Sequence, residues 1–244
     1  MGKQICSLFV ALGYDVNIWQ NSSEDLNQPI KNEISKIEKH FNIKANGKYS
    51  LIDDIVDLKP NLTIETIKED ITAKKDVISK LNYNENIFSN TSSINLSELG
   101  NNVNGFHFMN PVTIPLIELC KKGKYSENLL NDLISSLTKF SYSIIDVADK
   151  SGFLVNRILF KEISYFFYLY EVEKVSIKDL KKIYKIISNN SDPIKIVNMI
   201  GLDTSLSILE NLNRENKEIY IPDILKEMVK KGNLGYKNKK ILKL

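Results

Sequence analysis

The chain has 244 residues, of which 43% are hydrophobic and 26% charged, as in an ordinary globular protein. Its 33 basic and 30 acidic residues are well mixed and leave a net charge of +3, which argues against a nucleic-acid partner. No apolar run reaches the length of about 20 residues that spans a bilayer, and no secretory signal opens the chain. We therefore expect a cytoplasmic protein without a membrane partner.

The first part of the chain alternates between helical and strand patterns. Apolar residues over 5–12 follow helical spacing, Gly13 supplies a stop, and Val16–Trp19 has the pattern of a short strand. The same alternation then predicts helices over 30–41, 52–58 and 71–81, and strands over 62–67, 86–89 and 105–108. Strands that alternate with helices imply right-handed crossovers and a mostly parallel sheet.

The second part of the chain carries only helical periodicity. The spacing predicts helices over 153–171, 176–187, 193–212 and 224–229, and residues 149–152 have the composition of a hinge. We therefore expect an α/β domain over residues 1–148 and an all-helical domain over residues 149–244.

Candidate reactive side chains are few. Cys6 and Cys120 lie in apolar surroundings without metal-ligand spacing, so we expect buried thiols in a reducing compartment and no metal site. His40 ends an amphipathic helix, where a cation suits the helix dipole, and we interpret it as structural.

His107 is the stronger candidate, because it ends an apolar strand just before the Asn110-Pro111 turn. Glu118 follows within an apolar run, where a buried carboxylate is costly unless it is paired. A carboxylate that holds one imidazole nitrogen lets the other accept a proton. The alternative is a histidine that simply fills the core. We predict that His107 and Glu118 form a proton-transfer pair.

Several short motifs occur in a fixed order along the whole chain. They are Ser89–Ser93, His107–Pro111, Gly152–Arg157, Gly201–Asp203 and Leu234–Lys237. In this order and context they resemble the 3-hydroxyacyl-CoA dehydrogenases. The resemblance implies a Rossmann-type parallel sheet domain followed by the helical domain, and oxidoreductase activity in fatty acid metabolism.

The resemblance also implies catalytic roles for four residues. His107 would take the proton from the 3-hydroxyl of a 3-hydroxyacyl-CoA while hydride leaves for NAD, giving the 3-oxoacyl-CoA. Glu118 would orient the imidazole. Ser92 and Asn156 would hydrogen-bond the C3 oxygen. Because Asn156 belongs to the helical domain, the expected site lies in a cleft between the domains.

Four further residues are implied to contact NAD. Gly2 falls in the dinucleotide fingerprint, Gln20 ends the second strand of the fold beside the adenosine ribose, and Glu69 and Lys74 lie near the strand and loop beside the cofactor. A solvated helix start is the alternative for Glu69 and Lys74. Gln20 replaces the usual acidic residue, so this position does not indicate whether the cofactor is NAD or NADP.

The partners implied by the resemblance are an acyl-CoA thioester substrate and a second copy of the chain. The helical domain is the expected homodimer interface, and two apolar stripes could serve it or could be core. One stripe comprises Phe166, Phe167 and Leu169, and the other comprises Ile196, Met199 and Ile200.

The start of the chain departs from the family. Met1-Gly2 aligns with the last two positions of the G-x-G-x-x-G fingerprint, so the preceding strand and the first two glycines are absent. Four buried strand side chains at about 1.5–3 kcal/mol each compare with the about 5–15 kcal/mol that stabilises a whole domain. We therefore expect a weakened domain, and a misassigned start or a truncated gene copy. The alternative is a chain that is adapted to the missing strand.

Two alternatives follow from these departures. One is a truncated, catalytically impaired relic that only dimerises, because Lys3, Gln4 and Gln20 stand where the cofactor would be held. The other is a dehydrogenase that acts on hydroxyacyl groups bound to a carrier protein instead of CoA.

Overall fold

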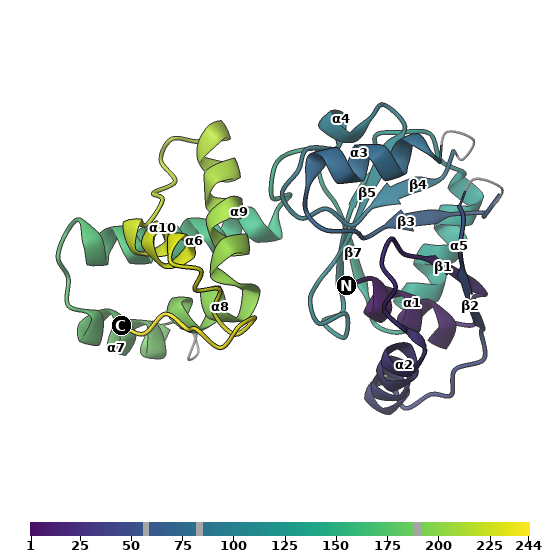
Figure 1. Ribbon diagram of the computed structural model, residues 1–244, viewed down its shortest axis with the longest axis horizontal. Helices are drawn as coiled ribbons and strands as arrows, with labels where there is room; N and C mark the ends of the chain where they lie inside the picture. The colour runs from purple at the N-terminus through teal and green to yellow at the C-terminus, as the bar shows by residue number, and fades with distance from the viewer. Residues whose placement is uncertain (56–58, 82–84, 188–191) are drawn as a thin grey trace. The chain divides into compact units, whose positions relative to one another are not determined.

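The computed structural model describes residues 1–55, 59–81, 85–187 and 192–244. The chain divides into two compact units, Met1–Lys150 and Ser151–Leu244. The first unit contains every named strand and five helices of the described chain, and the second contains only helices (Figure 1). Among the described residues, no helix is both long enough and apolar enough to cross a bilayer.

The elements of the first unit alternate along the chain. Its helices are α1 (Gly2–Ala11), α2 (Asn27–Phe41), α3 (Ile71–Ser79), α4 (Leu96–Leu99) and α5 (Glu127–Thr138). Its strands are β1 (Val16–Trp19), β2 (Tyr49–Ile52), β3 (Thr63–Glu65), β4 (Ile87–Ser89), β5 (Val103–Phe108), β6 (Leu116–Cys120) and β7 (Ser143–Asp146).

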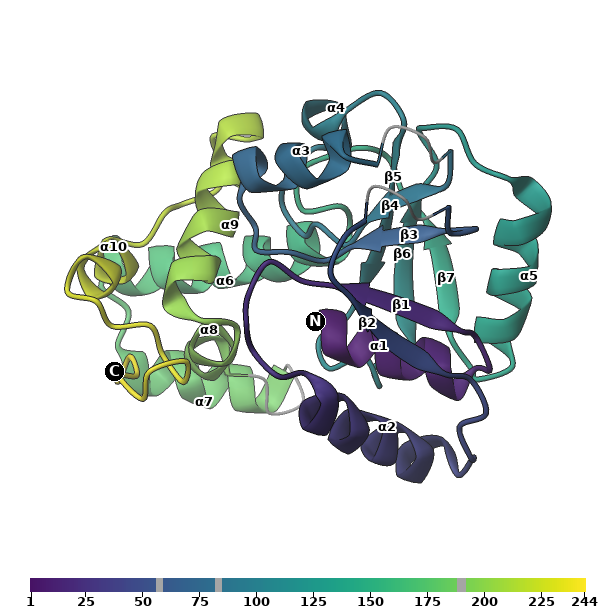
Figure 2. The same cartoon turned by 45° about the vertical axis from the view of Figure 1, so that its right-hand side comes forward.

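The strands form two sheets. β1 and β2 pair in parallel, and β3-β4-β5-β6-β7 form a five-stranded sheet in which only the β5–β6 pair is antiparallel. Both ribbon views draw β1 between β2 and β3 (Figures 1 and 2). This confirms the expected Rossmann-type, mostly parallel sheet with helices between its strands.

Several elements of this unit differ from the sequence-based expectation. The helix predicted over 52–58 is wrong at its start, because Ile52 is the last residue of β2 and pairs with Trp19 in β1. The rest of that prediction falls partly on residues 56–58, outside the described residues. Strands β2, β6 and β7 and helices α4 and α5 were not expected. A reversal into an antiparallel strand is not signalled by the alternating pattern that predicts crossovers.

The larger core of the first unit lies where α1 and α5 pack against the five-stranded sheet, and a smaller one lies between α1 and α2. The buried positions of α5 repeat every three or four residues, which places them on one face of that helix. The fully or nearly fully buried members of this core include Leu8, Phe88, Phe106, Phe108, Ile117, Leu130, Leu133 and Leu137. The outer helices α3 and α4 lie together in both ribbon views.

The described part of the second unit is all-helical, as its periodicity predicts, but it contains five helices where four were expected. They are α6 (Val155–Glu171), α7 (Ile177–Ile187), α8 (Pro193–Ile200), α9 (Leu202–Glu215) and α10 (Asp223–Lys230). The single helix expected over 193–212 is wrong, because Gly201 has φ +104° and separates α8 from α9. Phe166 and Phe167 of the expected interface stripe are fully buried and belong to the core.

Candidate active site

The centre of the candidate site is a histidine–glutamate contact across two strands. His107 on β5 lies directly opposite Glu118 on β6 in the antiparallel register. Its Nδ1 is 2.7 Å from Oε2 of Glu118, and both side chains are buried. Because the partner strand is antiparallel, the facing pair points to the same side of the sheet. The structure therefore brings together the two residues that the sequence predicts as a pair.

The end of β5 is anchored by polar side chains from other elements. Oδ1 of Asn90 accepts the backbone N–H of Phe108 at 2.8 Å. Oε1 of Gln4, in the first turns of α1, accepts the backbone N–H of Val112 at 2.8 Å. The hydroxyl of Tyr142 donates to the carbonyl of Val112. These contacts fix the backbone on the carboxyl side of His107.

Ser92 lies in the loop that follows β4, at the carboxyl end of a parallel strand. Its backbone N–H donates to Oε1 of Glu69 at 2.8 Å. Glu69 lies in the loop between β3 and α3, so neighbouring strands place the two residues together. Ligand groups in α/β proteins gather at this edge of a sheet.

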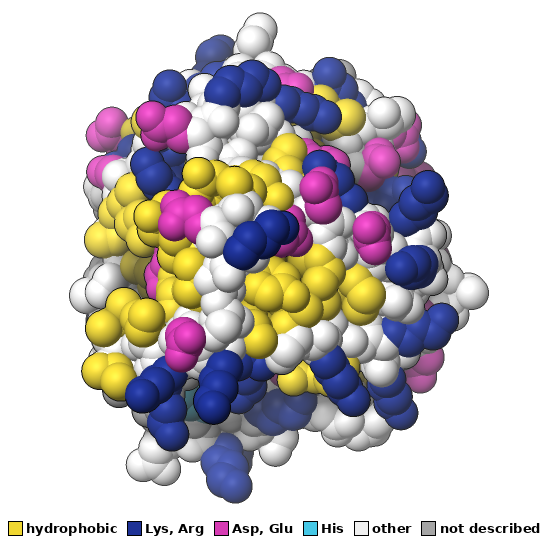
Figure 3. Space-filling view, turned by 90° about the vertical axis from the view of Figure 1, so that its left-hand side faces the viewer, with side chains coloured by type: hydrophobic (Ala, Val, Ile, Leu, Met, Phe, Trp, Pro, Cys, Tyr) yellow, Lys and Arg dark blue, Asp and Glu magenta, His cyan; other side chains and the backbone are white. Residues whose placement is uncertain are grey.

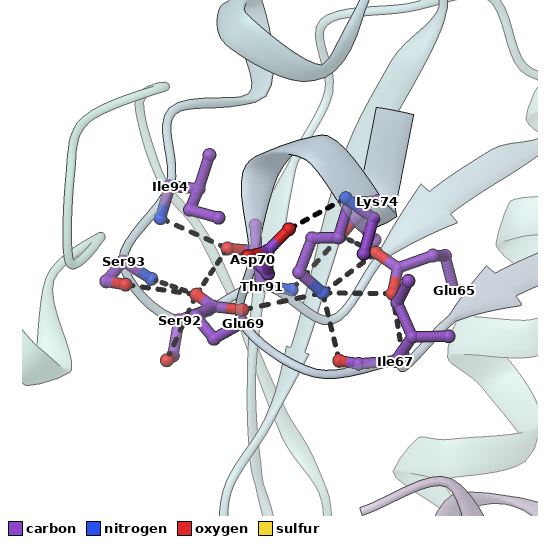
Figure 4. Close-up of polar contacts among 11 residues, drawn as sticks. Glu65, Ile67, Glu69, Asp70, Lys74, Thr91, Ser92, Ser93 and Ile94 are labelled. Atoms are coloured by element: carbon purple, nitrogen blue, oxygen red, sulfur yellow. Dashed lines mark hydrogen bonds and ion pairs between the residues drawn. The ribbon is translucent and has the colours of Figure 1, made fainter. Parts of the chain in front are cut away.

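Lys74 lies at the same edge of the sheet, one turn into α3, and only 1% of its side chain is exposed. Its Nζ is 2.9 Å from Oε1 and 3.0 Å from Oε2 of Glu65. The same Nζ lies 3.4 Å from Oε2 of Glu69 (Figure 4). The solvated helix start considered for Lys74 is therefore wrong, because its ammonium is enclosed by two carboxylates.

Asn156 lies at the start of α6 in the second unit and is buried. The turn before it depends on Gly152, which has φ +74°. A Cβ at Gly152 would also lie 3.0 Å from the side chain of Leu212 on α9. The local fold of the second unit thus fixes the position of Asn156 within that unit.

The residues at the start of the chain fit a dinucleotide. A Cβ on Gly2 would lie 2.6 Å from Oγ1 of Thr66, so only glycine allows the first turn of α1 to approach the carboxyl end of β3 this closely. No described side chain caps the N-terminus of α1, which suits an anionic ligand. Gln20 follows β1, and its Nε2 donates to the carbonyl of Glu24 at 2.6 Å.

Neither cysteine supplies a nucleophile. Burial raises the pKa of the Cys6 thiol to about 12. Burial, with the nearby carboxylates of Asp149 and Asp146, raises that of Cys120 to about 11. Both thiols are protonated at neutral pH, in keeping with the expected buried thiols.

Some polar residues of the site were not expected from the sequence. Glu65 and Ser89 end two neighbouring strands, and Oγ of Ser89 donates to Oε2 of Glu65 at 2.6 Å. Lys74 shares its helix face with Val77 and Ile78, three and four positions on, and all three are buried. That apolar spacing was the signal that could have predicted a buried lysine and a buried acidic partner.

Comparisons with known proteins agree with the motifs. The family description "3-hydroxyacyl-CoA dehydrogenase, NAD binding domain" matches residues 1–150, and "3-hydroxyacyl-CoA dehydrogenase, C-terminal domain" matches residues 152–242. A 3-hydroxybutyryl-CoA dehydrogenase of Clostridioides difficile is 28% identical over 265 residues, covering 98% of this chain and 94% of that protein. A probable 3-hydroxybutyryl-CoA dehydrogenase of Bacillus subtilis is 30% identical over 193 residues, covering 73% of this chain and 67% of that protein.

A solved structure gives the same result. The crystal structure of (S)-3-hydroxybutyryl-CoA dehydrogenase from Ralstonia eutropha aligns with a TM-score of 0.82 and 25% identity, covering 100% of this chain and 96% of that one. The expected family is therefore confirmed over both units. The chain belongs to the 3-hydroxyacyl-CoA dehydrogenase family, with that family's NAD-binding domain followed by its C-terminal domain.

Proposed function

We propose that this protein interconverts 3-hydroxyacyl-CoA and 3-oxoacyl-CoA with NAD(H). The observation that carries the proposal is the buried 2.7 Å contact between Nδ1 of His107 and Oε2 of Glu118. The names of the relatives support a short acyl chain, since they are 3-hydroxybutyryl-CoA dehydrogenases. We keep the cytoplasm as the expected location and fatty acid metabolism as the expected context.

In the oxidative direction, His107 takes the proton of the 3-hydroxyl group through the ring nitrogen that does not face Glu118. Glu118 holds the imidazole in the required tautomer and stabilises the imidazolium that forms. Ser92 and Asn156 donate hydrogen bonds to the C3 oxygen, where negative charge develops. In the reductive direction, the imidazolium returns its proton to that oxygen.

NAD supplies the hydride acceptor for C3 when it is bound. We propose that Gly2 and the first turn of α1 receive its pyrophosphate and that Gln20 contacts its adenosine ribose. The tight packing of Gly2 against Thr66 supports this placement. The prediction that Glu69 and Lys74 also contact the dinucleotide stays untested, and their contacts support a different role.

The direct test is the reduction of acetoacetyl-CoA by purified protein, which is monitored as the loss of NADH absorbance. We expect turnover that His107→Gln abolishes and His40→Gln leaves unchanged, since His40 is exposed on α2. Absence of turnover across short- and medium-chain 3-oxoacyl-CoA substrates would reject the proposal. Comparing the same acyl group on CoA and on a carrier protein separates the two substrate classes.

The divided sheet favours a second candidate, in which the first unit has lost cofactor binding and the protein only dimerises. β1 and β3 belong to different sheets. Calorimetric titration with NADH distinguishes the two candidates, because tight binding by this chain eliminates the second.

Dimerisation through the helical unit is part of both candidates. Three apolar side chains, two on α6 and one at its C-cap, repeat every seven residues and are exposed: Ile158 at 64%, Tyr165 at 57% and Val172 at 48%. Figure 3 shows a face of the molecule on which apolar side chains gather, with lysines and arginines around them. Such stripes suit helix-to-helix contact with a second copy. Sedimentation of wild type and Ile158→Lys tests this, because only the variant should sediment as a monomer.

A further inference from the structure

One carboxylate oxygen organises the loop that carries Ser92. Oε1 of Glu69 accepts the hydroxyl of Thr91 at 2.6 Å and the backbone N–H groups of Ser92 and Ser93 at 2.8 and 2.9 Å. The hydroxyl of Ser93 adds a fourth donor at 3.0 Å. Three consecutive residues therefore converge on a single acceptor (Figure 4). Successive backbone N–H groups arranged in this way form an anion-binding concavity, and here the anion is a side chain of the same protein.

Glu69 is itself held from the opposite side. Its Oε2 faces the buried ammonium of Lys74 at 3.4 Å, and that ammonium is bound by both oxygens of Glu65. The backbone N–H of Ile67 donates to Oε1 of Glu65 at 2.6 Å. The cluster thus ties the carboxyl end of β3 to that of β4.

The charge balance of the cluster matches this role. Two carboxylates and one ammonium leave one excess negative charge, which hydroxyl and backbone donors stabilise. Burial alone would raise the pKa of Glu69, but Lys74 and the donors from Thr91, Ser92 and Ser93 hold it below its usual value. Glu69 therefore remains an anionic acceptor throughout the neutral range.

We infer that Glu69 is a positioning residue for the reaction, acting through the backbone of the Ser92 loop. The inference rests on the proposed function, in which Ser92 donates to the C3 oxygen. Oγ of Ser92 lies 3.4 Å from Oε1 of Glu69. A donor to a developing oxyanion is effective only when it is held in place before the reaction. The ammonium of Lys74, which is paired with Glu65, holds the Glu69 carboxylate on the side opposite the loop.

The test compares Glu69→Ala with Glu69→Gln. Alanine removes the acceptor, and we expect kcat to fall about 10²-fold, as for loss or misplacement of an oxyanion donor, while the Kd of NADH stays within about twofold of wild type. Glutamine keeps an oxygen that accepts the same N–H groups, and it should recover most of the lost kcat. Asp76→Ala is the matched control, because Asp76 is an exposed carboxylate on α3 paired with Lys80; it should change neither quantity.

Two further measurements make the test decisive. If Glu69 acts through Ser92, adding Ser92→Ala to Glu69→Ala lowers kcat no further than the larger single effect. Amide hydrogen exchange at Ser92 and Ser93 should accelerate in Glu69→Ala and stay slow in Glu69→Gln and Asp76→Ala.

The exchange measurement needs no turnover, so it separates this inference from the proposed function. An inactive wild type would reject the proposed function, and exchange would still decide whether Glu69 clamps the loop. Unchanged exchange in Glu69→Ala overturns the inference. So does a tenfold or larger weakening of NADH binding with kcat retained, which would make Glu69 a dinucleotide contact.

Discussion

Two buried charge clusters in the first unit solve the same energetic problem in different ways. On β5 and β6, one carboxylate of Glu118 faces one imidazole of His107 at 2.7 Å. At the ends of β3 and β4, the ammonium of Lys74 joins the carboxylates of Glu65 and Glu69 at 2.9 and 3.4 Å. Both clusters carry the cost of desolvation. The first suits proton exchange, whereas the second suits a fixed geometry.

The largest expected effect breaks the first cluster. His107→Gln removes the group that exchanges a proton, and we expect kcat for acetoacetyl-CoA reduction to fall by about 10²–10⁴-fold. Steady-state kinetics measure this, with His40→Gln as the histidine control. A fall of less than tenfold would show that His107 is not the proton-transfer residue.

Breaking the second cluster should instead appear in stability. Lys74→Met leaves the buried carboxylate of Glu65 and the partly exposed carboxylate of Glu69 without their ammonium. We expect a loss of about 3–5 kcal/mol in the free energy of unfolding. Urea titration at neutral pH measures it. Lys75→Met is the matched control, because Lys75 is the exposed neighbour on α3, and its effect should stay within about 0.5 kcal/mol. Equal losses for both variants would contradict a structural ion cluster.

A single hydrogen bond to this cluster should have a smaller effect. Ser89→Ala removes the 2.6 Å donor to Glu65, and a hydrogen bond to a charged group contributes about 1.5–3 kcal/mol to stability. Ser7→Ala is the comparison, since Ser7 is equally buried but donates to the neutral carbonyl of Lys3. Its cost should be about 0.5–1.5 kcal/mol. The ranking fails if Ser7→Ala is the more damaging change in the same urea assay.

The smallest expected effect is the acid dependence of stability. The pKa of Glu69 in the folded protein lies below its ordinary value of 4.5. Its contribution is therefore fully present above the unfolded pKa and is lost as the pH falls through the folded pKa. Thermal melts across this acidic range should drop more steeply for wild type than for Glu69→Gln. If the melting temperatures of wild type and Glu69→Gln fall equally as the pH is lowered, the Glu69 carboxylate is not stabilised by folding.

The two clusters also differ in how far the sequence predicts them. His107 and Glu118 were paired correctly, because a carboxylate inside an apolar run requires a partner and one nearby histidine was available. The strand that carries Glu118 was not predicted, since its antiparallel direction depends on tertiary pairing. Lys74 was predicted to lie near the surface or a cofactor, because charged residues at a helix start are usually solvated.

Helix positions were predicted better than their interruptions. Apolar spacing predicted α2 and α6 closely, since it reflects one buried face. The break between α8 and α9 depends on the positive φ of Gly201, and a lone glycine within a periodic run does not reveal its own backbone angle. The loop contacts of Glu69 involve residues more than twenty positions away, and local patterns carry no information about them.

The separation of β1 from β3 has a consequence for solubility. The end strand of a sheet offers backbone groups to which a strand of another molecule can pair. Strand β3 ends the five-stranded sheet, and β1 belongs to a sheet of only two strands. Both are short, with three and four residues, and short edges limit the number of hydrogen bonds that a second molecule can add. In concentrated solution we expect strands of different molecules to associate first at the edges of β1 and β3. Because these two strands are short, we expect that association to be weak.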